Sequence, residues 1–259
     1  MDMGSNRALE RRAHEEPKVL SNPFLSAKHK LPFSDRLQLF NLGKADPMEY
    51  KCIIFDSDGV LVDSETISAR VFQEMAWELG IKLDFTSALE QFCGSSMRED
   101  LQFIKENIDG ELPADFEKEF RARTYEAFKK ELKAVDGVQE LIQKLNVPFC
   151  VASSGPTEKI RLNLGLVNLL GQFENKIYSS YEIDSWKPEP GIFLHAARSM
   201  GFTPEECVVI EDSAHGVLAA LSGGFQVYAL ANEAKRKTFE DMGARVFKNM
   251  KELEKLLEL

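Results

Sequence analysis

The chain has few cysteines, few histidines, no long apolar run and no excess of positive charge. Its four cysteines are scattered without the spacing of a disulfide framework or a zinc site, so we expect reduced thiols in the core. No stretch approaches the roughly 20 apolar residues of a membrane span, and residues 1–20 contain no signal-like apolar segment. A net charge of −10 argues against general affinity for nucleic acid or anionic membranes. We therefore expect a cytoplasmic protein that binds neither, acting as a monomer or weak dimer.

The 259 residues suffice for one large domain or two modest ones. Residues 1–47 differ from the remainder, because four prolines interrupt any periodic pattern and large aromatics are few. A leader, a transit segment or a short docking arm would have this composition. We predict a mostly disordered N-terminal extension without a catalytic role.

Apolar runs that alternate with helical patterns predict an α/β protein. Strands are expected at 52–55, 148–152, 176–179, 207–211 and 226–230, most of them separated by single helices, and a short αβα segment closes the chain. Such spacing favours parallel pairing with right-handed crossovers. The predicted core is a Rossmann-like parallel sheet made of residues 48–63 and 134–259. Between these parts, residues 64–133 contain only helical patterns, at about 64–80, 84–92, 98–107 and 114–132, so we predict a small four-helix cap domain.

The first predicted strand ends in Asp56-Ser57-Asp58-Gly59. In α/β sheets the carboxyl ends of strands open into the ligand crevice, and residues i and i+2 of an extended backbone point the same way. Asp56 and Asp58 would therefore project together into that crevice. Two adjacent carboxylates repel each other unless a cation lies between them or one keeps a proton. The pattern indicates a metal site or an acid/base pair, although two turn-forming aspartates are the simpler alternative.

Three later strands also lead into polar residues. Ser153-Ser154-Gly155 precedes a helix, where the group can hold a phosphate or can simply cap the helix. Lys187 stands before Pro188 in a stiff segment, which aims its ammonium group, although an isolated Lys-Pro is usually a solvated loop. The fourth strand ends in Glu211, and Asp212 follows it. Repulsion between these adjacent carboxylates favours a bound cation, although a helix N-terminus has the same composition.

Together these four motifs, in this order and with a helical insert after the first, resemble the signature motifs of the haloacid-dehalogenase-like hydrolases. The segments FDSDGVLVDSE, SWKPEPGIF and VVIEDSAHGV are similar to the subgroup whose helical cap follows the first motif. Within it, YSSYEIDSWKPEP and VASSGPTEKI resemble the branch that includes bacterial 6-phosphogluconate phosphatase and the β-phosphoglucomutases. The resemblance covers roughly residues 49–259.

The resemblance implies a phosphatase that acts on a small phosphate ester, such as a sugar phosphate or a 6-phosphogluconate-like metabolite. Asp56 would be the nucleophile that forms an aspartyl-phosphate, and Asp58 the general acid and base. Ser153 and Lys187 would hold the phosphoryl group, with Ser154 and Gly155 beside them. Mg²⁺ would be held by a set of acidic residues: Asp56, Asp58, Glu211 and Asp212.

Family resemblance places substrate specificity in the cap, where Gly94, Ser95, Ser96 and Arg98 form a polar loop. A helix N-cap with Arg98 in solvent is an equal alternative. His215, after the metal motif, is expected on a helix surface rather than as a ligand. Trp186 is expected either to line the site or to pack beside it.

The competing activity on this scaffold is that of a β-phosphoglucomutase. That family carries a cap histidine, which aligns with Ser68, and a Lys-Gly pair, which aligns with Cys93-Gly94. Because residues 64–133 contain no histidine, we favour hydrolysis. A haloacid dehalogenase needs neither metal nor Asp58, and a non-catalytic binding protein would be expected to lose an acid or the lysine.

Overall fold

The computed structural model describes residues 50–92 and 95–259. The predicted N-terminal extension, together with Cys93 and Gly94, lies outside the described residues. Three predicted reduced cysteines, Cys52, Cys150 and Cys207, are free and buried. No helix in the described part of the chain is both long and apolar enough to cross a membrane.

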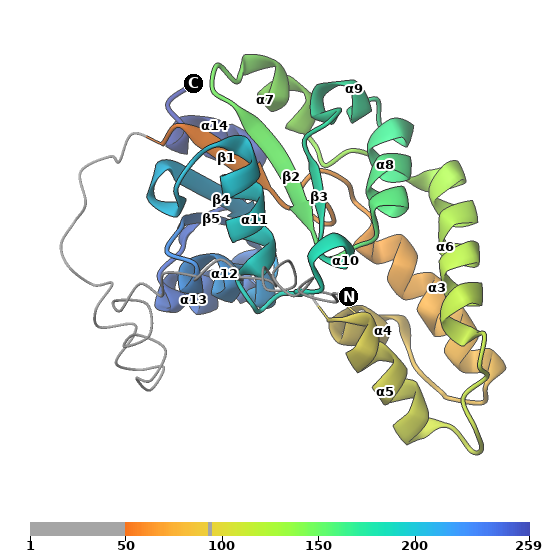
Figure 1. Ribbon diagram of the computed structural model, residues 1–259. Coiled ribbons are helices and arrows are strands. Elements are labelled where there is room, and N and C mark those ends of the chain that lie inside the picture. Colours follow the sequence, from red (N-terminus) through yellow and green to blue (C-terminus); the bar gives the residue numbers. More distant parts are fainter. Residues whose placement is uncertain (1–49, 93–94) are drawn as a thin grey trace, which may run out of the picture. The chain divides into compact units, whose positions relative to one another are not determined.

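Six strands of the described chain form one sheet in the order β3-β2-β1-β4-β5-β6, and every neighbouring pair is parallel (Figure 1). This confirms the predicted Rossmann-like α/β fold. The order places β1 centrally, between β2 and β4, where the chain switches direction across the sheet and ligands usually bind. The strands are β1 (Cys52–Phe55), β2 (Phe149–Ser153), β3 (Ile177–Ser179), β4 (Cys207–Glu211), β5 (Gln226–Leu230) and β6 (Arg245–Phe247).

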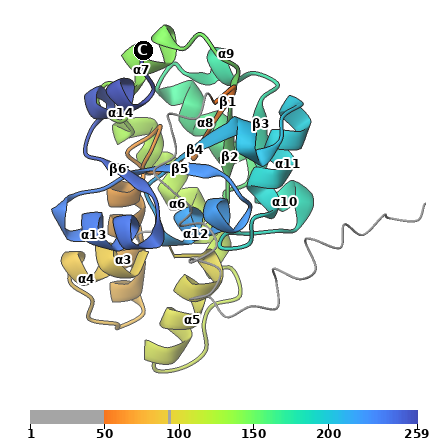
Figure 2. The ribbon, with the colours of Figure 1, turned by 90° about the vertical axis from the view of Figure 1, so that its left-hand side faces the viewer.

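Helices cover both faces of the sheet (Figure 2). Alternate residues of β1 enter two different apolar clusters: Ile53 and Phe55 face one, and Cys52 and Ile54 face the other. The first cluster is completed by α7 (Val138–Lys144), α8 (Thr157–Leu166), α9 (Leu170–Phe173) and α14 (Met250–Leu256). The second is completed by α11 (Gly191–Met200), α12 (Ala214–Ser222) and α13 (Glu233–Met242). Burial on both faces explains the continuous apolar runs of these strands.

Two short helices follow β2 and β3. Residues 157–173 form two helices, α8 and α9, rather than one, because Asn168 adopts a left-handed conformation with φ +58°. The helix α10 (Ser180–Ile183) follows β3 directly, and its N-terminus is capped by the Ser179 side chain. The 3-10 helix η1 (Pro204–Glu206) leads into β4.

The expected four-helix insert is present between β1 and α7. It consists of α3 (Glu65–Glu78), α4 (Phe85–Phe92), α5 (Met97–Asn107) and α6 (Phe116–Glu131), drawn in orange to yellow-green in Figure 1. These helices share an apolar cluster of their own. At its centre the Phe72 ring lies 5.7 Å from Phe92, 6.2 Å from Phe103 and 6.1 Å from Phe120. We refer to residues 65–131 as the helical insert.

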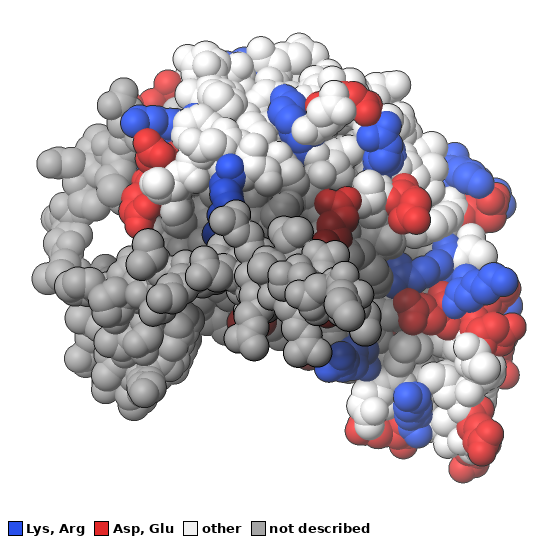
Figure 3. Space-filling view, in the orientation of Figure 1, with Lys and Arg blue, Asp and Glu red and all other residues white. Residues whose placement is uncertain are grey.

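Charged side chains of both signs are interspersed over the described part of the face shown in Figure 3. Within the described chain, several charged side chains form ion pairs along helices, such as Arg121–Glu117 and Lys237–Asp241. Such pairs solvate the surface and add little stability individually.

We predict that Phe72→Ala destabilises the helical insert by about 3–5 kcal/mol, because the buried ring leaves a cavity among three aromatic neighbours. Phe85→Ala, the same change at a 39% exposed ring, is the matched control and should cost far less. Denaturant unfolding of both variants measures the difference. Equal losses would contradict the assignment of Phe72 to the centre of the insert.

Candidate active site

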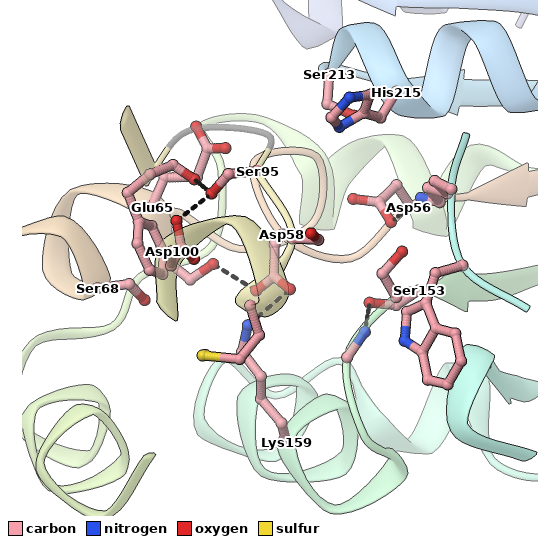
Figure 4. Close-up of a pocket in the computed structure, with 18 of the residues that line it drawn as sticks. Asp56, Asp58, Glu65, Ser68, Ser95, Asp100, Ser153, Lys159, Ser213 and His215 are labelled. Atoms are coloured by element: carbon pink, nitrogen blue, oxygen red, sulfur yellow. Dashed lines mark hydrogen bonds and ion pairs between the residues drawn. The ribbon is translucent and has the colours of Figure 1, made fainter. Parts of the chain in front are cut away.

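Three adjacent strands bring the predicted polar residues to one edge of the sheet. Asp56 directly follows β1, Ser153 ends β2, and Glu211 ends β4 with Asp212 next along the chain. Phe55 pairs in register with Val151 on one side and Ile210 on the other, so these strand ends are level. Figure 4 shows Asp56, Asp58 and Ser153 facing the same cavity.

Lys187 joins two of these strand ends. Its Nζ lies 2.6 Å from Asp56 Oδ1 and 2.6 Å from Glu211 Oε1, and only 6% of its side chain is exposed. Residues separated by 131 and 24 positions in the sequence therefore meet at one buried ammonium group. This juxtaposition is the one that the order of motifs predicted.

Glu211 is held from both sides. Its Oε1 accepts from Lys187, and its Oε2 accepts from the backbone N–H of Asp212 at 2.7 Å and of Ser213 at 2.8 Å, and from Ser213 Oγ at 3.0 Å. A Cβ on Gly216 would overlap this carboxylate, so the first turn of α12 needs glycine there. Glu211 thereby fixes the position of Lys187.

Asp212 also lies against a glycine. A Cβ on Gly59 would overlap the Asp212 carboxylate, and Gly59 has a left-handed φ of +77°. The glycine of the first motif therefore both turns the chain and lets Asp212 approach the end of β1.

Asp56, Glu211 and Asp212 form a group that fits a divalent cation. Each offers a carboxylate oxygen within 4.8 Å of the others, and all three residues are buried. Burial, opposed by Lys187 and reinforced by Glu211, raises the pKa of Asp56 to about 7. Burial, then the charges of Glu65 and Glu211, raises the pKa of Asp212 well above its usual value. One lysine among several acids leaves negative charge that a hard, oxygen-binding cation such as Mg²⁺ would neutralise.

Asp58 has a separate set of partners. Its Oδ1 accepts from Ser64 Oγ at 2.5 Å, and its Oδ2 forms an ion pair with Lys159 Nζ at 2.9 Å (Figure 4). Burial raises the pKa of Asp58, but Lys159 and Ser64 outweigh it, so the pKa lies below the ordinary value. Its carboxylate is thus held by partners outside the three-acid group.

The segment Ser153-Ser154-Gly155 lines the cavity ahead of α8. Ser153 Oγ accepts from the Gly155 N–H at 3.1 Å, so the segment is tied together by a local hydrogen bond. The N-cap of α8 is Pro156, so the alternative that these serines cap the helix is wrong. All three residues line the same cavity as Asp56.

The helical insert closes the other side of a cavity of about 190 Å³. Its contribution includes Ser68, Ser95, Ser96 and three residues that the sequence did not single out: Phe92, Asp100 and Arg121. Ser96 is also the N-cap of α5 in a capping box with Glu99. Arg98 is exposed on α5 and is not among the residues that line the cavity.

Two aromatic or basic side chains flank the cavity from the sheet side. Trp186 lines it and packs edge-on against Tyr181, with ring centroids 5.4 Å apart, so both expected roles apply. His215 lies half-buried in the first turn of α12 and lines the cavity.

Lys159 is the residue of this site that the sequence reasoning missed most clearly. It occupies the first turn of α8, where acidic side chains are favoured by the helix dipole and a lysine is unfavourable. Because a lysine is unfavourable there, its presence six residues after Ser153 could have indicated that an acidic side chain lies nearby. Asp100 and Arg121 carried no comparable pattern.

Known proteins share both the sequence and the fold of this chain. A sequence model of the family described as haloacid dehalogenase-like hydrolase matches residues 50–224. The 6-phosphogluconate phosphatase of Escherichia coli (strain K12) is 31% identical over 207 residues, which cover 80% of this chain and 94% of that protein. Hexitol phosphatase A of the same organism is 29% identical over 188 residues, covering 71% and 84% respectively. The structure of a HAD family hydrolase from Deinococcus radiodurans with bound phosphate and sodium aligns with a TM-score of 0.67 at 31% identity, covering 82% and 96%.

We predict opposite stability effects for two glycine-to-alanine changes in helices. Gly216→Ala forces the Glu211 carboxylate off Lys187 and should cost about 1–3 kcal/mol, as overpacking typically does. Gly165→Ala in α8, where the nearest atom to a new Cβ is 3.9 Å away, should instead stabilise by about 0.5–1 kcal/mol. Denaturant unfolding measures both, and a stable Gly216→Ala variant would contradict the described packing of Glu211.

Proposed function

The chain belongs to the haloacid dehalogenase-like hydrolases, and we propose that it is a Mg²⁺-dependent phosphatase that hydrolyses a small phosphorylated metabolite through an aspartyl-phosphate. The observation that carries this proposal is the contact of Lys187 with both Asp56 and Glu211 beside Asp212. A carboxylate, a fixed ammonium group and a cation site at one strand end are what phosphoryl transfer needs, since its catalysis is mostly positioning and charge stabilisation.

Asp56 is the proposed nucleophile. Lys187 holds its Oδ1, which leaves Oδ2 without a hydrogen-bond donor among the described residues. Attack of this carboxylate on phosphorus forms a bond to Asp56 and breaks the bond to the leaving oxygen, which takes a proton. Water then attacks the aspartyl-phosphate, so that one difficult displacement becomes two easier ones.

Asp58 is the proposed acid and base of the two half-reactions. Lys159 and Ser64 keep it ionised in the described state, which is the form that takes a proton from water in the second half. Release from this pair would let it carry a proton to the leaving oxygen in the first half. Ser153, Ser154, Gly155 and Lys187 are proposed to hold the phosphoryl group.

Mg²⁺ would be held by the carboxylates of Asp56, Asp212 and Glu211 and by the backbone carbonyl of Asp58. When bound there, it would supply positive charge against the phosphoryl oxygens. The support for this assignment is the buried three-acid group, whose oxygens lie within 4.8 Å of one another.

We propose that residues 64–133 act as a cap over the core of residues 48–63 and 134–259. The two connecting segments run side by side, since the Asp63 N–H donates to Lys133 O and the Val135 N–H donates to Leu61 O. A paired connection of this kind suits a hinge at 63–64 and 134–136. Closure would exclude water and complete the site, with Ser95 and Ser96 toward the substrate.

Hydrolysis is favoured over sugar phosphomutation by the residue at position 68. The β-phosphoglucomutases carry a histidine at the aligned position, whereas Ser68 lines the cavity here. The aligned Lys-Gly position, Cys93-Gly94, lies outside the described residues. A non-catalytic role is disfavoured because Asp56, Asp58, Lys187 and Asp212 are all present.

The testing experiment is a phosphate-release assay with Mg²⁺ over a panel of sugar phosphates, sugar acid phosphates and p-nitrophenyl phosphate. Asp56→Asn should lower turnover by more than about 10³-fold, as loss of a covalent nucleophile does. Asp109→Asn, the same change at an exposed acid that does not line the cavity, is the control and should keep activity. Retained turnover in Asp56→Asn would remove the nucleophile, and a product shift without free phosphate would favour the mutase.

A further inference from the structure

Arg121 differs from the other cations that line the cavity. Lys187 is committed to Asp56 and Glu211, and Lys159 is committed to Asp58. Arg121 comes from α6 of the helical insert and contacts none of these acids. Arg121 is therefore a positive charge in the cavity to which the proposed hydrolysis of a phosphate ester assigns no role.

The guanidinium group of Arg121 is fixed but incompletely satisfied. Its Nε and Nη2 donate to Glu117 Oε1 at 3.0 and 2.6 Å, and Nη2 also donates to Tyr181 Oη at 2.7 Å. The two N–H groups of Nη1 have no hydrogen-bond acceptor among the described residues. The side chain is 22% exposed and lines the cavity, so the guanidinium group is partly buried at the cavity wall.

Aromatic packing connects Arg121 to the catalytic side of the cavity. Its guanidinium carbon lies 5.7 Å from the centre of the Tyr181 ring, and Tyr181 packs against Trp186, the residue before Lys187. All three side chains line the cavity. The arginine is thus held in a defined position on the wall that leads away from Lys187.

The geometry of α6 separates Arg121 from the end of the helix that lies near Lys159. Lys159, which pairs with Asp58, lies 5.9 Å from the Phe128 ring of this helix. Arg121 precedes Phe128 by seven residues, which is roughly 10 Å along a helix that rises 1.5 Å per residue. A short carbon chain with its phosphate at Asp56 would reach toward Arg121 with its far end.

The remaining groups of the insert suit hydroxyls along such a chain. Ser68, Ser95 and Ser96 line the cavity, and Ser95 Oγ lies 2.6 Å from Asp100 Oδ1. Burial raises the pKa of Asp100 to about 7, with an opposing hydrogen bond from Ser95 and a reinforcing charge from Glu99. Asp100 therefore repels an anion less than an ordinary carboxylate does, and it can exchange hydrogen bonds with hydroxyl groups.

We propose that Arg121 recognises a carboxylate at the end of the substrate opposite the transferred phosphoryl group, so that the substrate class is a phosphorylated sugar acid. A guanidinium group matches a carboxylate in charge and in the geometry of its N–H donors. One arginine, partly neutralised by Glu117, balances a single negative charge better than the double charge of a second phosphate. This inference rests on the proposed phosphatase function.

The test compares two substrates that differ only at the far end. In 6-phosphogluconate the terminal carbon is a carboxylate, whereas in sorbitol 6-phosphate it is a hydroxymethyl group. The wild-type protein should show the higher kcat/KM on 6-phosphogluconate. Arg121→Met should lower that value by about 10- to 100-fold, the range expected for a hydrogen bond to a charged group, with a much smaller fall on sorbitol 6-phosphate.

Three further variants separate recognition from structural support. Arg123→Met is the matched control, because Arg123 lies on the same helix, pairs with Glu78 and Glu119, and does not line the cavity. Its kcat/KM on both substrates should equal that of the wild type. Arg121→Lys keeps the charge but loses the planar guanidinium group. Its kcat/KM on 6-phosphogluconate should therefore lie between those of the wild type and Arg121→Met. Tyr181→Phe removes the bond to Tyr181 Oη while keeping Arg121, and should retain the preference for the carboxylate.

Each contrary result has its own meaning. If Arg121→Met lowered kcat/KM equally on both substrates, Arg121 would have only a structural role and the proposal would be overturned. A wild-type protein without preference for 6-phosphogluconate would also overturn it. If fructose 1,6-bisphosphate alone showed the dependence on Arg121, the second anion would be a phosphate and the carboxylate assignment would be wrong. These outcomes leave the proposed phosphatase intact, whereas no turnover of any ester, including p-nitrophenyl phosphate, would remove both.

Discussion

A single buried ammonium group, that of Lys187, holds the described site together. Burying several carboxylates at one edge of a sheet is unfavourable, because each loses hydration and repels the others. Lys187 offsets part of that cost through equal 2.6 Å contacts with Asp56 and Glu211, and the backbone N–H groups after β4 satisfy the remaining oxygen of Glu211. Since buried ion pairs contribute little net stability, their value here lies in fixing positions. The acids left unneutralised, Asp212 above all, are the reason that the site favours a cation.

Short apolar runs in the sequence are enough to produce this arrangement. Apolar runs that are buried on both faces predict the parallel strands, and each strand delivers its last residues to the same edge. Two glycines complete the geometry: Gly59 admits Asp212 to the end of β1, and Gly216 admits the Glu211 carboxylate into the first turn of α12. The helical insert then adds a second wall whose polar residues differ in kind from those at the strand ends. In the proposed function, chemistry and substrate recognition are therefore assigned to different parts of the chain that share one cavity.

Site residues that lie at the ends of predicted strands could be predicted from sequence. Site residues whose long side chains meet only after helices pack together could not. The strand ends at Asp56, Ser153 and Glu211 follow from periodicity, and so do the four helices of the insert. The contact of Lys159 with Asp58 depends on how α8 is rotated against β1, which no local pattern encodes. Arg121 likewise meets Tyr181 of α10 only because α6 packs beside α8. The division of α8 from α9 depends on the left-handed backbone of Asn168, a tendency too weak to predict from one residue.

The measurement that tests the central claim most directly is thermal unfolding with and without Mg²⁺ between about pH 5 and pH 8. The folded-state pKa of Asp56 is raised to about 7 and that of Asp212 is also raised, so without metal these groups stabilise the fold at low pH and the contribution is lost as pH rises through the folded pKa values. Mg²⁺ binds the ionised carboxylates, so it should raise the unfolding temperature more at pH 8 than at pH 5, and Asp212→Asn should remove most of that increase. An unfolding temperature that Mg²⁺ leaves unchanged at both pH values would contradict the account.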